Sequence, residues 1–235
     1  MSIKLLHISD THGYHKEFPM EKFIGYDMII HSGDCSNYRD TARNYHEVAD
    51  FIEWFAMIPI EHKIYVAGNH DTSIERRQIT TRHFEDRAII YLEHDSVEIE
   101  GYKIFGSPYT PTFCDWSFMK SRDKMHRLWE SVPPVDILVT HGPPKGVRDL
   151  TENRDGEYEQ VGDLSLMKWI FKNPPKLHLF GHIHDMDGIH NQGVSIYSKC
   201  PTHFSNGSCV HDGKAGLKSF GNGFTLQLST VPDQV

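Results

Sequence analysis

Five short motifs built from metal-ligand residues follow one another along the chain, each directly after an apolar stretch. They are Asp10-Thr11-His12, Gly33-Asp34, Gly68-Asn69-His70-Asp71, His141-Gly142 and Gly181-His182-Ile183-His184. The apolar stretches predict strands, and side chains that follow the carboxyl ends of such strands meet at one edge of a sheet. Asp10 and Asp34 offer two carboxylates, and the motifs add one amide and several imidazoles, enough for two metal ions that share a ligand. A metal pair is a common device for attacking a phosphate ester with water.

No single motif is specific. Asp-x-His is a frequent loop sequence, and an aspartate after a glycine is as typical of a turn as of a metal site. The adjacent Asn69 and His70 are more informative, because an amide oxygen suits a hard cation while a neighbouring imidazole can face the substrate. Ligand-type residues at five successive strand ends are not expected by accident, so we interpret the set as one pocket.

Most of the other histidines are predicted not to bind metal. The chain has 17 histidines, so a single His-x-His pair arises easily by chance. Four that flank or lie inside predicted strands are expected to be packed or hydrogen-bonded: His7, His31, His62 and His178. The sequence contains no G-x-x-x-x-G-K phosphate loop and no G-x-S-x-G nucleophile motif, which argues against a nucleotide-binding P-loop and a serine hydrolase.

Composition limits the class of protein. The 235 residues fit one domain, predicted to span 1–235, and 38% hydrophobic with 24% charged residues is typical of a soluble globular protein. The formal net charge of -8 argues against a duplex nucleic acid partner, since such surfaces bind by neutralising phosphates.

The four cysteines are scattered and form no C-x-x-C pair. This argues against a zinc finger or a thiol-redox site and favours reduced thiols, as expected in the cytoplasm. The first residues do not resemble a signal peptide, and no stretch is apolar enough to cross a bilayer. We therefore expect a cytoplasmic protein without a membrane partner.

The order of the predicted elements indicates an α/β fold. Apolar strands are expected over residues 3–8, 27–31 and 63–67. Before the third strand, apolar residues spaced at i, i+3, i+4 and i+7 predict a helix over 45–58. Alternation of strand, helix and strand is typical of an α/β architecture with a largely buried sheet.

The middle of the chain has a different pattern. Short strands over 88–92, 97–100 and 103–105, with turns between them, suggest a meander. A helix over 122–131 ends before two prolines, and a strand over 136–140 leads to His141.

Towards the C-terminus, Asp163 is a plausible N-cap for a helix that runs through Ile170. A strand over 177–180 leads to His182, and two further strand candidates are 194–197 and 224–228. The segment 200–223 has no clear pattern.

The motif order D-x-H, G-D, G-N-H-[DE], H-G and G-H-x-H resembles that of the calcineurin-like metallophosphoesterases. The similarity covers most of residues 3–200, and within the superfamily it is greatest to the metallophosphoesterase-domain-containing (MPPED) phosphodiesterases. The residues of this closer similarity are Ala67-Gly68-Asn69-His70, Gly106-Ser107-Pro108, Phe113-Cys114-Asp115-Trp116, Thr140-His141-Gly142-Pro143-Pro144 and the run from Lys176 to His184. The resemblance implies a β-sandwich flanked by helices, a four-layer αββα arrangement that agrees with the α/β pattern.

The resemblance also implies roles for the motif residues. One metal ion would be held by Asp10, His12, Asp34 and His184. The other would be held by Asp34, Asn69, His141 and His182, with Asp34 as the bridge. Asn69 and His70 would contact the substrate, and His70 would protonate the leaving oxygen. Mn²⁺ or Fe suits this mixed nitrogen and oxygen set better than Mg²⁺.

The sequence departs from the protein phosphatases of the superfamily. Their Gly-Asp motif continues to Asp-Arg-Gly, whereas here Gly33-Asp34 continues as Cys-Ser-Asn-Tyr-Arg-Asp over residues 35–40. The residue that orients the acid histidine in those enzymes is therefore missing, and a protein phosphatase is disfavoured.

We expect a phosphodiesterase that depends on two metal ions and hydrolyses small phosphodiesters, possible substrates being cyclic nucleotides such as 2′,3′-cyclic species. The resemblance implies attack by a hydroxide that bridges the ions. A phosphomonoesterase or a single-strand nuclease is the alternative within the superfamily, although the acidic composition argues against a nuclease. A metal-bound nucleotide-binding scaffold without turnover is the alternative of another class, against which the intact ligand set argues. Tyr109, Phe113 or Trp116 could stack on a base, although packing in a core or lid is the more typical role of such residues.

Overall fold

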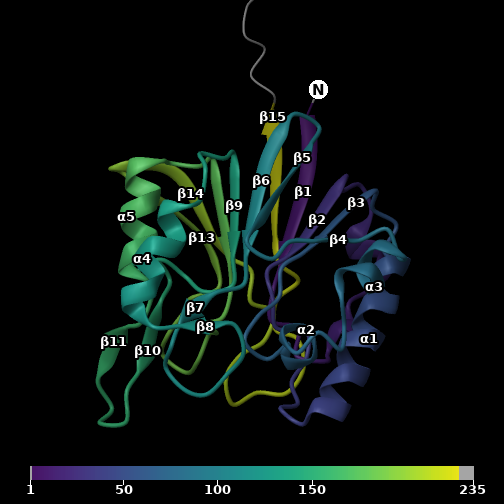
Figure 1. Ribbon diagram of the computed structural model, residues 1–235, viewed down its shortest axis with the longest axis horizontal. Helices are drawn as coiled ribbons and strands as arrows, with labels where there is room; N and C mark the ends of the chain where they lie inside the picture. Colours follow the sequence, from purple (N-terminus) through teal and green to yellow (C-terminus); the bar gives the residue numbers. More distant parts are fainter. Residues whose placement is uncertain (1, 228–235) are drawn as a thin grey trace, which may run out of the picture.

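The computed structural model describes residues 2–227, in which two large β-sheets face each other with helices on their outer sides (Figure 1). The first sheet has five strands in the order β15-β1-β2-β3-β4. Its strands are β1 (Ser2–Ile8), β2 (Met28–His31), β3 (His62–Tyr65), β4 (Ile90–Tyr91) and β15 (Asn222–Gln227). The strands β1 to β4 are parallel, and β15 pairs antiparallel with β1.

The second sheet has six strands in the order β13-β14-β12-β9-β6-β5. Its strands are β5 (Asp95–Ile99), β6 (Tyr102–Ser107), β9 (Ile137–Thr140), β12 (Leu177–Phe180), β13 (Gly193–Tyr197) and β14 (Cys200–Asn206). The four central strands are parallel, and the two edge strands β5 and β13 are antiparallel to their neighbours. In both sheets the parallel strands therefore send their carboxyl ends towards the lower side of Figure 1.

The remaining elements surround the two sheets. The helices are α1 (Thr41–Met57), α2 (Thr72–Glu75), α3 (Thr81–Glu85), α4 (Arg122–Glu130) and α5 (Leu164–Lys172), and two short 3₁₀ helices cover His15–Glu17 and Met20–Phe23. Two small pairs, β7 (Thr110–Pro111) with β8 (Met119–Lys120) and β10 (Leu150–Glu152) with β11 (Tyr158–Gln160), lie near the carboxyl ends of the sheets (Figure 1).

Three layers of apolar side chains hold the structure together. Between the sheets, Leu5 and Ile64 of the first sheet share a cluster with Ile137 and Leu179 of the second. A second cluster joins α1 to the outer face of the first sheet, and a third joins α4 and α5 to the outer face of the second. The arrangement of helix, sheet, sheet and helix confirms the four-layer αββα fold expected from the sequence.

Local sequence explains where the main helices begin. The Asp40 carboxylate accepts a hydrogen bond from the backbone N–H of Arg43 at 3.1 Å, and this N-cap starts α1 four residues before the predicted range. The Asp163 carboxylate accepts from the backbone N–H of Ser165 at 2.8 Å, so the predicted N-cap of α5 is confirmed. Asp163 also accepts from the indole N–H of Trp129 at 2.6 Å, which ties α5 to α4.

Two parts of the fold differ from the prediction. The predicted meander is wrong, because β4 pairs with β3 in the first sheet while β5 and β6 form a hairpin in the second. The segment without a clear pattern contains β14, a central part of the second sheet. Its buried residues include Thr202, Ser205 and Asn206, so apolar periodicity gave no signal for this strand.

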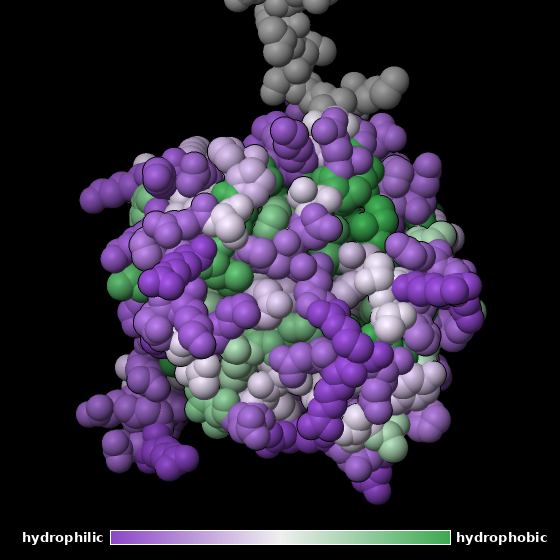
Figure 2. Space-filling model, in the orientation of Figure 1, coloured by the Kyte–Doolittle hydropathy of each residue, from purple (hydrophilic) through white to green (hydrophobic). Residues whose placement is uncertain are grey.

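Hydrophilic side chains cover most of the face seen in Figure 2. Among residues 2–227, no helix combines the length and the apolar character needed to cross a bilayer. All four cysteines are free.

Candidate metal centre

All five motifs lie in the loops that follow parallel strands, and they meet at the carboxyl edge shared by the two sheets. β1 leads to Asp10 and His12, β2 to Asp34, and β3 to Asn69 and His70. From the second sheet, β9 leads to His141, and β12 leads to His182 and His184. The structure thus brings together every residue that the sequence predicted for the site.

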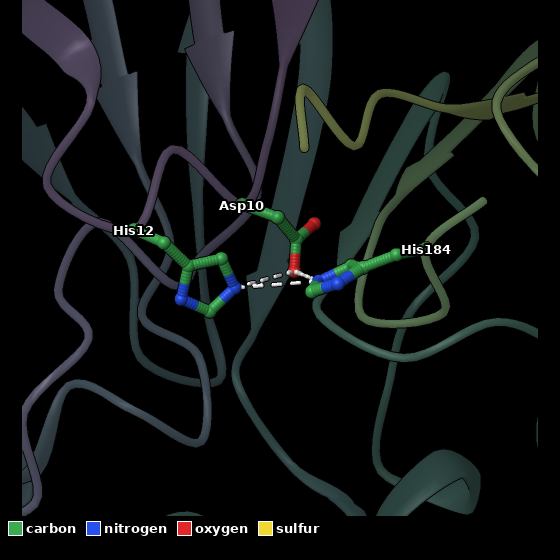
Figure 3. A group of neighbouring side chains, drawn as sticks. All are labelled: Asp10, His12 and His184. Atoms are coloured by element: carbon green, nitrogen blue, oxygen red, sulfur yellow. Dashed lines mark hydrogen bonds and ion pairs between the residues drawn. The ribbon is translucent and has the colours of Figure 1, made fainter. Parts of the chain in front are cut away.

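One group of ligand atoms consists of Asp10, His12 and His184, whose side chains point toward one another in Figure 3. The Nε2 atoms of His12 and His184 are 3.3 Å apart, and Nε2 of His184 lies 3.1 Å from a carboxylate oxygen of Asp10. Asp34 is adjacent, with an oxygen 3.9 Å from Nε2 of His12. The three donors and Asp34 surround a position suited to one cation.

A second group consists of Asp34, His141 and His182. Nε2 of His141 lies 3.3 Å from a carboxylate oxygen of Asp34 and 2.9 Å from the amide oxygen of Asn69. Because Asp34 borders both groups, its carboxylate is in position to join two cations. The geometry therefore divides the residues as the resemblance implies, while their binding of metal stays a prediction.

His70 lies beside both groups. One of its ring nitrogens is close enough to Asp34 and His12 for the three side chains to form a further possible ligand set. Its Nδ1, however, is 3.2 Å from the backbone carbonyl of Asn37, and its backbone N–H donates to Asp34 at 2.7 Å. If the ring donates from Nδ1 to Asn37, Nε2 is left to face the pocket.

The backbone at the site is strained. Asp10, His12, Asp34 and His182 all have a positive φ, between 42° and 70°. Residues other than glycine rarely adopt this left-handed conformation, which is retained where the surrounding structure requires it. Four of the seven predicted ligands have a positive φ. The loops therefore adopt an unfavourable backbone conformation that directs these side chains towards one point.

Two of the motif glycines are required by close packing. A Cβ at Gly68 would lie 2.6 Å from the ring of His141 and would also meet the Asp34 carboxylate. A Cβ at Gly181 would meet the Asp10 carboxylate. These glycines allow the backbone to pass directly beside the carboxylates, which explains their position in the motifs.

Three imidazoles are oriented through Nδ1, which leaves Nε2 directed into the site. Nδ1 of His141 is 2.9 Å from the carbonyl oxygen of Ser32, and Nδ1 of His12 is 3.1 Å from that of Ser36. Nδ1 of His184 is 2.6 Å from the carboxylate of Asp212. Such contacts fix the tautomer and the ring orientation of metal-ligating histidines in proteins.

The two acidic ligands stay ionised. Burial alone would raise the pKa of the Asp34 carboxyl, but the neighbouring imidazoles of His141 and His70 hold that pKa well below its usual range. Burial opposes ionisation of Asp10 in the same way, and the hydrogen bond and charge of His184 lower its pKa below the usual range.

The imidazoles respond in two ways. Burial alone would lower the pKa of His141, but the charge and hydrogen bond of Asp34 raise it to about 9. Burial likewise opposes the shift at His184, whose pKa the Asp10 and Asp212 carboxylates raise to about 10. Burial lowers the pKa of His12 to about 4 and that of His182 to about 3. Positive charge is therefore favoured at two separate points of the pocket.

This donor set fits divalent cations. Two buried carboxylates face imidazole Nε2 atoms at 3.1–3.3 Å, and the nearest imidazoles hold extra protons. Metal ions need deprotonated ligands and would replace those protons. A mixture of imidazole, carboxylate and amide donors is suited to divalent transition metals.

Two residues of the site were not predicted as functional. Asp71 closes the G-N-H-D motif, and its buried carboxylate accepts hydrogen bonds from the hydroxyl of Tyr65 at 2.6 Å and the backbone N–H groups of Gly68 and Asp34 at 2.7 and 3.0 Å. Its place in the motif was a signal. Asp212, which contacts His184, lies in the segment without a clear pattern and had no local signal.

A cleft of about 610 Å³ opens beside the second group of ligands. Its lining includes His182, Phe113, Arg122 and Lys145. The Phe113 side chain is 55% exposed, and its ring centre lies 5.4 Å from that of His182.

The other two aromatic residues considered for base stacking differ. Tyr109 packs against the cluster beneath α1, which is the core role expected for it. Trp116 packs on the ring of His70.

The two facing sheets and the paired ligand groups at their carboxyl edge define the metallophosphoesterase class. In agreement, the family described as calcineurin-like phosphoesterase matches residues 3–186. The chain belongs to this family, whose members use divalent metal ions, and the family predicted from the motif order is confirmed.

Among characterised sequences, the chain is 31% identical over 215 residues to metallophosphoesterase domain-containing protein 1 of Homo sapiens and of Mus musculus. The similarity covers 81% of this chain and 63% of each relative, so the chain spans somewhat less than two thirds of the length of these curated relatives.

Solved structures agree with the fold. One crystal structure superposes with a TM-score of 0.65 at 14% identity, covering 88% of this chain and 90% of the other. The NAD nucleotidase of Haemophilus influenzae superposes with a TM-score of 0.50 at 12% identity, covering 88% of this chain and 45% of the other. At such low identity these similarities concern the fold alone.

Proposed function

We propose that the chain hydrolyses small phosphodiesters, with cyclic nucleotides, such as 2′,3′-cyclic species, as the leading substrates. The observation that carries this proposal is the position of His70 beside both ligand groups. The Nδ1 atom of this imidazole is already hydrogen-bonded to the backbone carbonyl of Asn37. Two divalent ions, when bound, supply an activated water and neutralise charge on the phosphoryl oxygens. We expect Mn²⁺ or Fe in this role.

The site residues would have three roles: binding the metal ions, contacting the phosphoryl group and donating a proton. The ions would be held by Asp10, His12, Asp34 and His184, and by Asp34, Asn69, His141 and His182. Asn69 would also contact the phosphoryl group. His70 would donate a proton from Nε2 to the leaving oxygen, as a general acid placed within hydrogen-bond reach of the substrate.

The adjacent cleft supports a small substrate. Its volume of about 610 Å³ lies within the range typical of sites for single small molecules. The exposed ring of Phe113 forms part of its wall and offers an apolar face to a base or another planar group. The net charge of -8 further disfavours a long polyanionic substrate.

The hydrogen bonds of the cations in the cleft support a diester over a monoester. A monoester dianion carries one more negative charge, which further free cations would stabilise. Arg122 donates to the carbonyl oxygens of Gly162 and Val161 at 3.3 and 3.1 Å, and Lys145 donates to that of Gln160 at 3.0 Å. Both cations of the cleft are thus already engaged with the backbone.

The test is a comparison of substrates on protein loaded with Mn²⁺ or Fe²⁺. We expect bis-p-nitrophenyl phosphate and at least one 2′,3′- or 3′,5′-cyclic nucleotide to be hydrolysed faster than p-nitrophenyl phosphate or a labelled single-stranded oligonucleotide. Metal content of protein purified without added metal identifies the resident ion. Faster hydrolysis of the monoester or the oligonucleotide would overturn the proposal in favour of those activities.

A metal-bound scaffold without turnover would give a different result in this test. Metal-loaded protein that binds nucleotides tightly but turns over no diester would be a binding protein rather than an enzyme.

A cytoplasmic location belongs to the same proposal, and the four free cysteines support it.

A further inference from the structure

Trp116 lies on the ring of His70. The two ring centres are 4.2 Å apart, and the planes are tilted by 34°. The guanidinium carbon of Arg39 is 4.0 Å from the centre of the same indole. His70 and Arg39 therefore both pack against the indole of Trp116.

His70 is held by other groups at its edges. Its Nδ1 is 3.2 Å from the carbonyl oxygen of Asn37, and the ring of His12 approaches it edge-on with 4.7 Å between centres. The indole covers the His70 ring with 4.2 Å between the ring centres, so a turn of the imidazole about its bond to Cβ would break this contact. Trp116 therefore supplies the contact that limits this rotation.

The indole is itself held in place. The guanidinium of Arg39 packs on the indole and donates to the backbone carbonyl of Asp115. Cation–π contacts of this kind are attractive, and an arginine offers a planar group that matches the ring. The segment 35–40 thus supplies both the carbonyl that bonds His70 and the arginine that holds Trp116.

The backbone beside Trp116 is fixed independently of its side chain. The N–H of Ser117 donates to the carbonyl of Asn69 at 3.2 Å, and the N–H of Phe118 donates to a carboxylate oxygen of Glu75 at 2.6 Å. The Ser117 hydroxyl donates to that of Thr72 at 3.1 Å. These bonds remain when the indole is removed, so truncation of Trp116 is a local change.

We propose that Trp116 is a positioning residue for His70, which keeps Nε2 directed at the leaving oxygen, and that Arg39 holds the indole in place. The inference rests on the proposed function. In the step concerned, the bond from phosphorus to the leaving oxygen breaks while a bond forms from phosphorus to the oxygen of water. The leaving oxygen takes a proton from Nε2 of His70, and the proton lost by water returns to His70 through solvent.

Two diesters that differ only in the leaving group provide the test. Methyl p-nitrophenyl phosphate releases a stable anion that needs little protonation, whereas methyl phenyl phosphate releases a more basic one. For Trp116→Ala we expect kcat for the phenyl ester to fall about 10- to 100-fold, the scale typical of a misplaced catalytic group. For the nitrophenyl ester we expect less than about a twofold change, with KM and metal content unchanged.

Three further variants connect the effect to the stack. Trp116→Phe keeps an aromatic face and should restore most of the lost kcat. Trp116→Ala added to His70→Ala should cause no further loss, because residues that act as a unit are not additive. Arg39→Ala should reproduce part of the selective loss, while the matched change Arg43→Ala, which removes a guanidinium stacked on Tyr38, should have no effect.

The outcomes separate the two proposals. If the wild-type protein hydrolyses neither ester, the proposed function fails, and the positioning role fails with it. If the wild type is active but Trp116→Ala slows both esters equally or not at all, the positioning role alone is overturned. A rise in KM with kcat unchanged would also overturn it, because Trp116 would then be a substrate contact.

Discussion

The carboxylate of Asp212 lies 2.6 Å from Nδ1 of His184, although 28 residues separate them along the chain. The backbone reinforces the contact, since the N–H of Asp212 donates to the carbonyl of Asp185 at 2.8 Å. The same imidazole approaches Asp10 through Nε2 at 3.1 Å. Asp212 thus contacts the side of the His184 imidazole that faces away from the site and orients Nε2 towards Asp10.

We predict that Asp212→Ala weakens metal binding at the first group about 10- to 100-fold, the range typical of a lost contact behind a metal-ligating histidine. Competition with a chelator, followed by metal content, measures the change. Asp187→Ala is the matched control, because that exposed carboxylate pairs with Lys214 and does not contact a ligand. Equal effects of the two substitutions would contradict a specific role for Asp212.

Substitution of His70 tests whether this residue is a general acid or a metal ligand. We predict that His70→Ala retains two metal ions per chain and loses turnover about 10²- to 10⁴-fold on diesters with basic leaving groups, the range typical of general acid catalysis. Metal analysis and steady-state kinetics on the same preparation provide the measurement. Loss of one ion would instead assign His70 to the ligand set that it forms with Asp34 and His12.

Asp34 couples the two groups of ligands. Its carboxylate lies 3.3 Å from Nε2 of His141 and 3.9 Å from Nε2 of His12. We predict that Asp34→Asn weakens binding of both ions together, because the substitution removes a charge that both groups share. Titration with Mn²⁺ followed by calorimetry should show two weakened sites. A variant that loses one site and keeps wild-type affinity at the other would show that Asp34 does not bridge.

The candidate site was predictable because its residues follow strand ends with a clear apolar signal. Asp10, Asp34 and His141 each stand within three residues of a buried parallel strand, so topology alone brings them together. The spacing of residues within a motif also survives folding, since it is fixed by the chain itself.

The parts that were missed depend on contacts between distant segments. Strand β14 of the second sheet contains several buried polar residues, and β4 joins the first sheet through its pairing with Ile64 and Tyr65 of β3. Asp212 and Trp116 contact residues far away in the sequence, His184 and His70. Periodicity and motif spacing carry no information on such pairs.

The buried His178 ring makes stability depend on pH. Its Nε2 is 2.8 Å from the hydroxyl oxygen of Thr140, and that hydroxyl donates to the carbonyl of Gly142 at 2.7 Å. Nε2 must therefore carry the ring proton, and Nδ1 is buried without a partner within residues 2–227. Burial, with a smaller effect of the nearby His7, lowers the pKa of His178 from 6.5 to about 3.

The sign of the effect follows from these two pKa values. Between pH 6.5 and about 3 the unfolded chain binds a proton at His178 that the folded chain does not. The free energy of unfolding therefore falls as the pH falls through this range, by about 1.4 kcal/mol per pH unit for one such group. Burial lowers the pKa of His7 and His31 to about 3 as well, so they add to the slope.

We predict that His178→Gln, which keeps an N–H for the Thr140 hydroxyl, reduces this slope by roughly the share of one group, about 1.4 kcal/mol per pH unit. Urea unfolding at several pH values between 6 and 4, with a chelator present to exclude metal linkage, measures it. His190→Gln is the control, because that side chain is 85% exposed and is solvated in both states. If both variants keep the wild-type slope, buried neutral His178 does not contribute to acid unfolding.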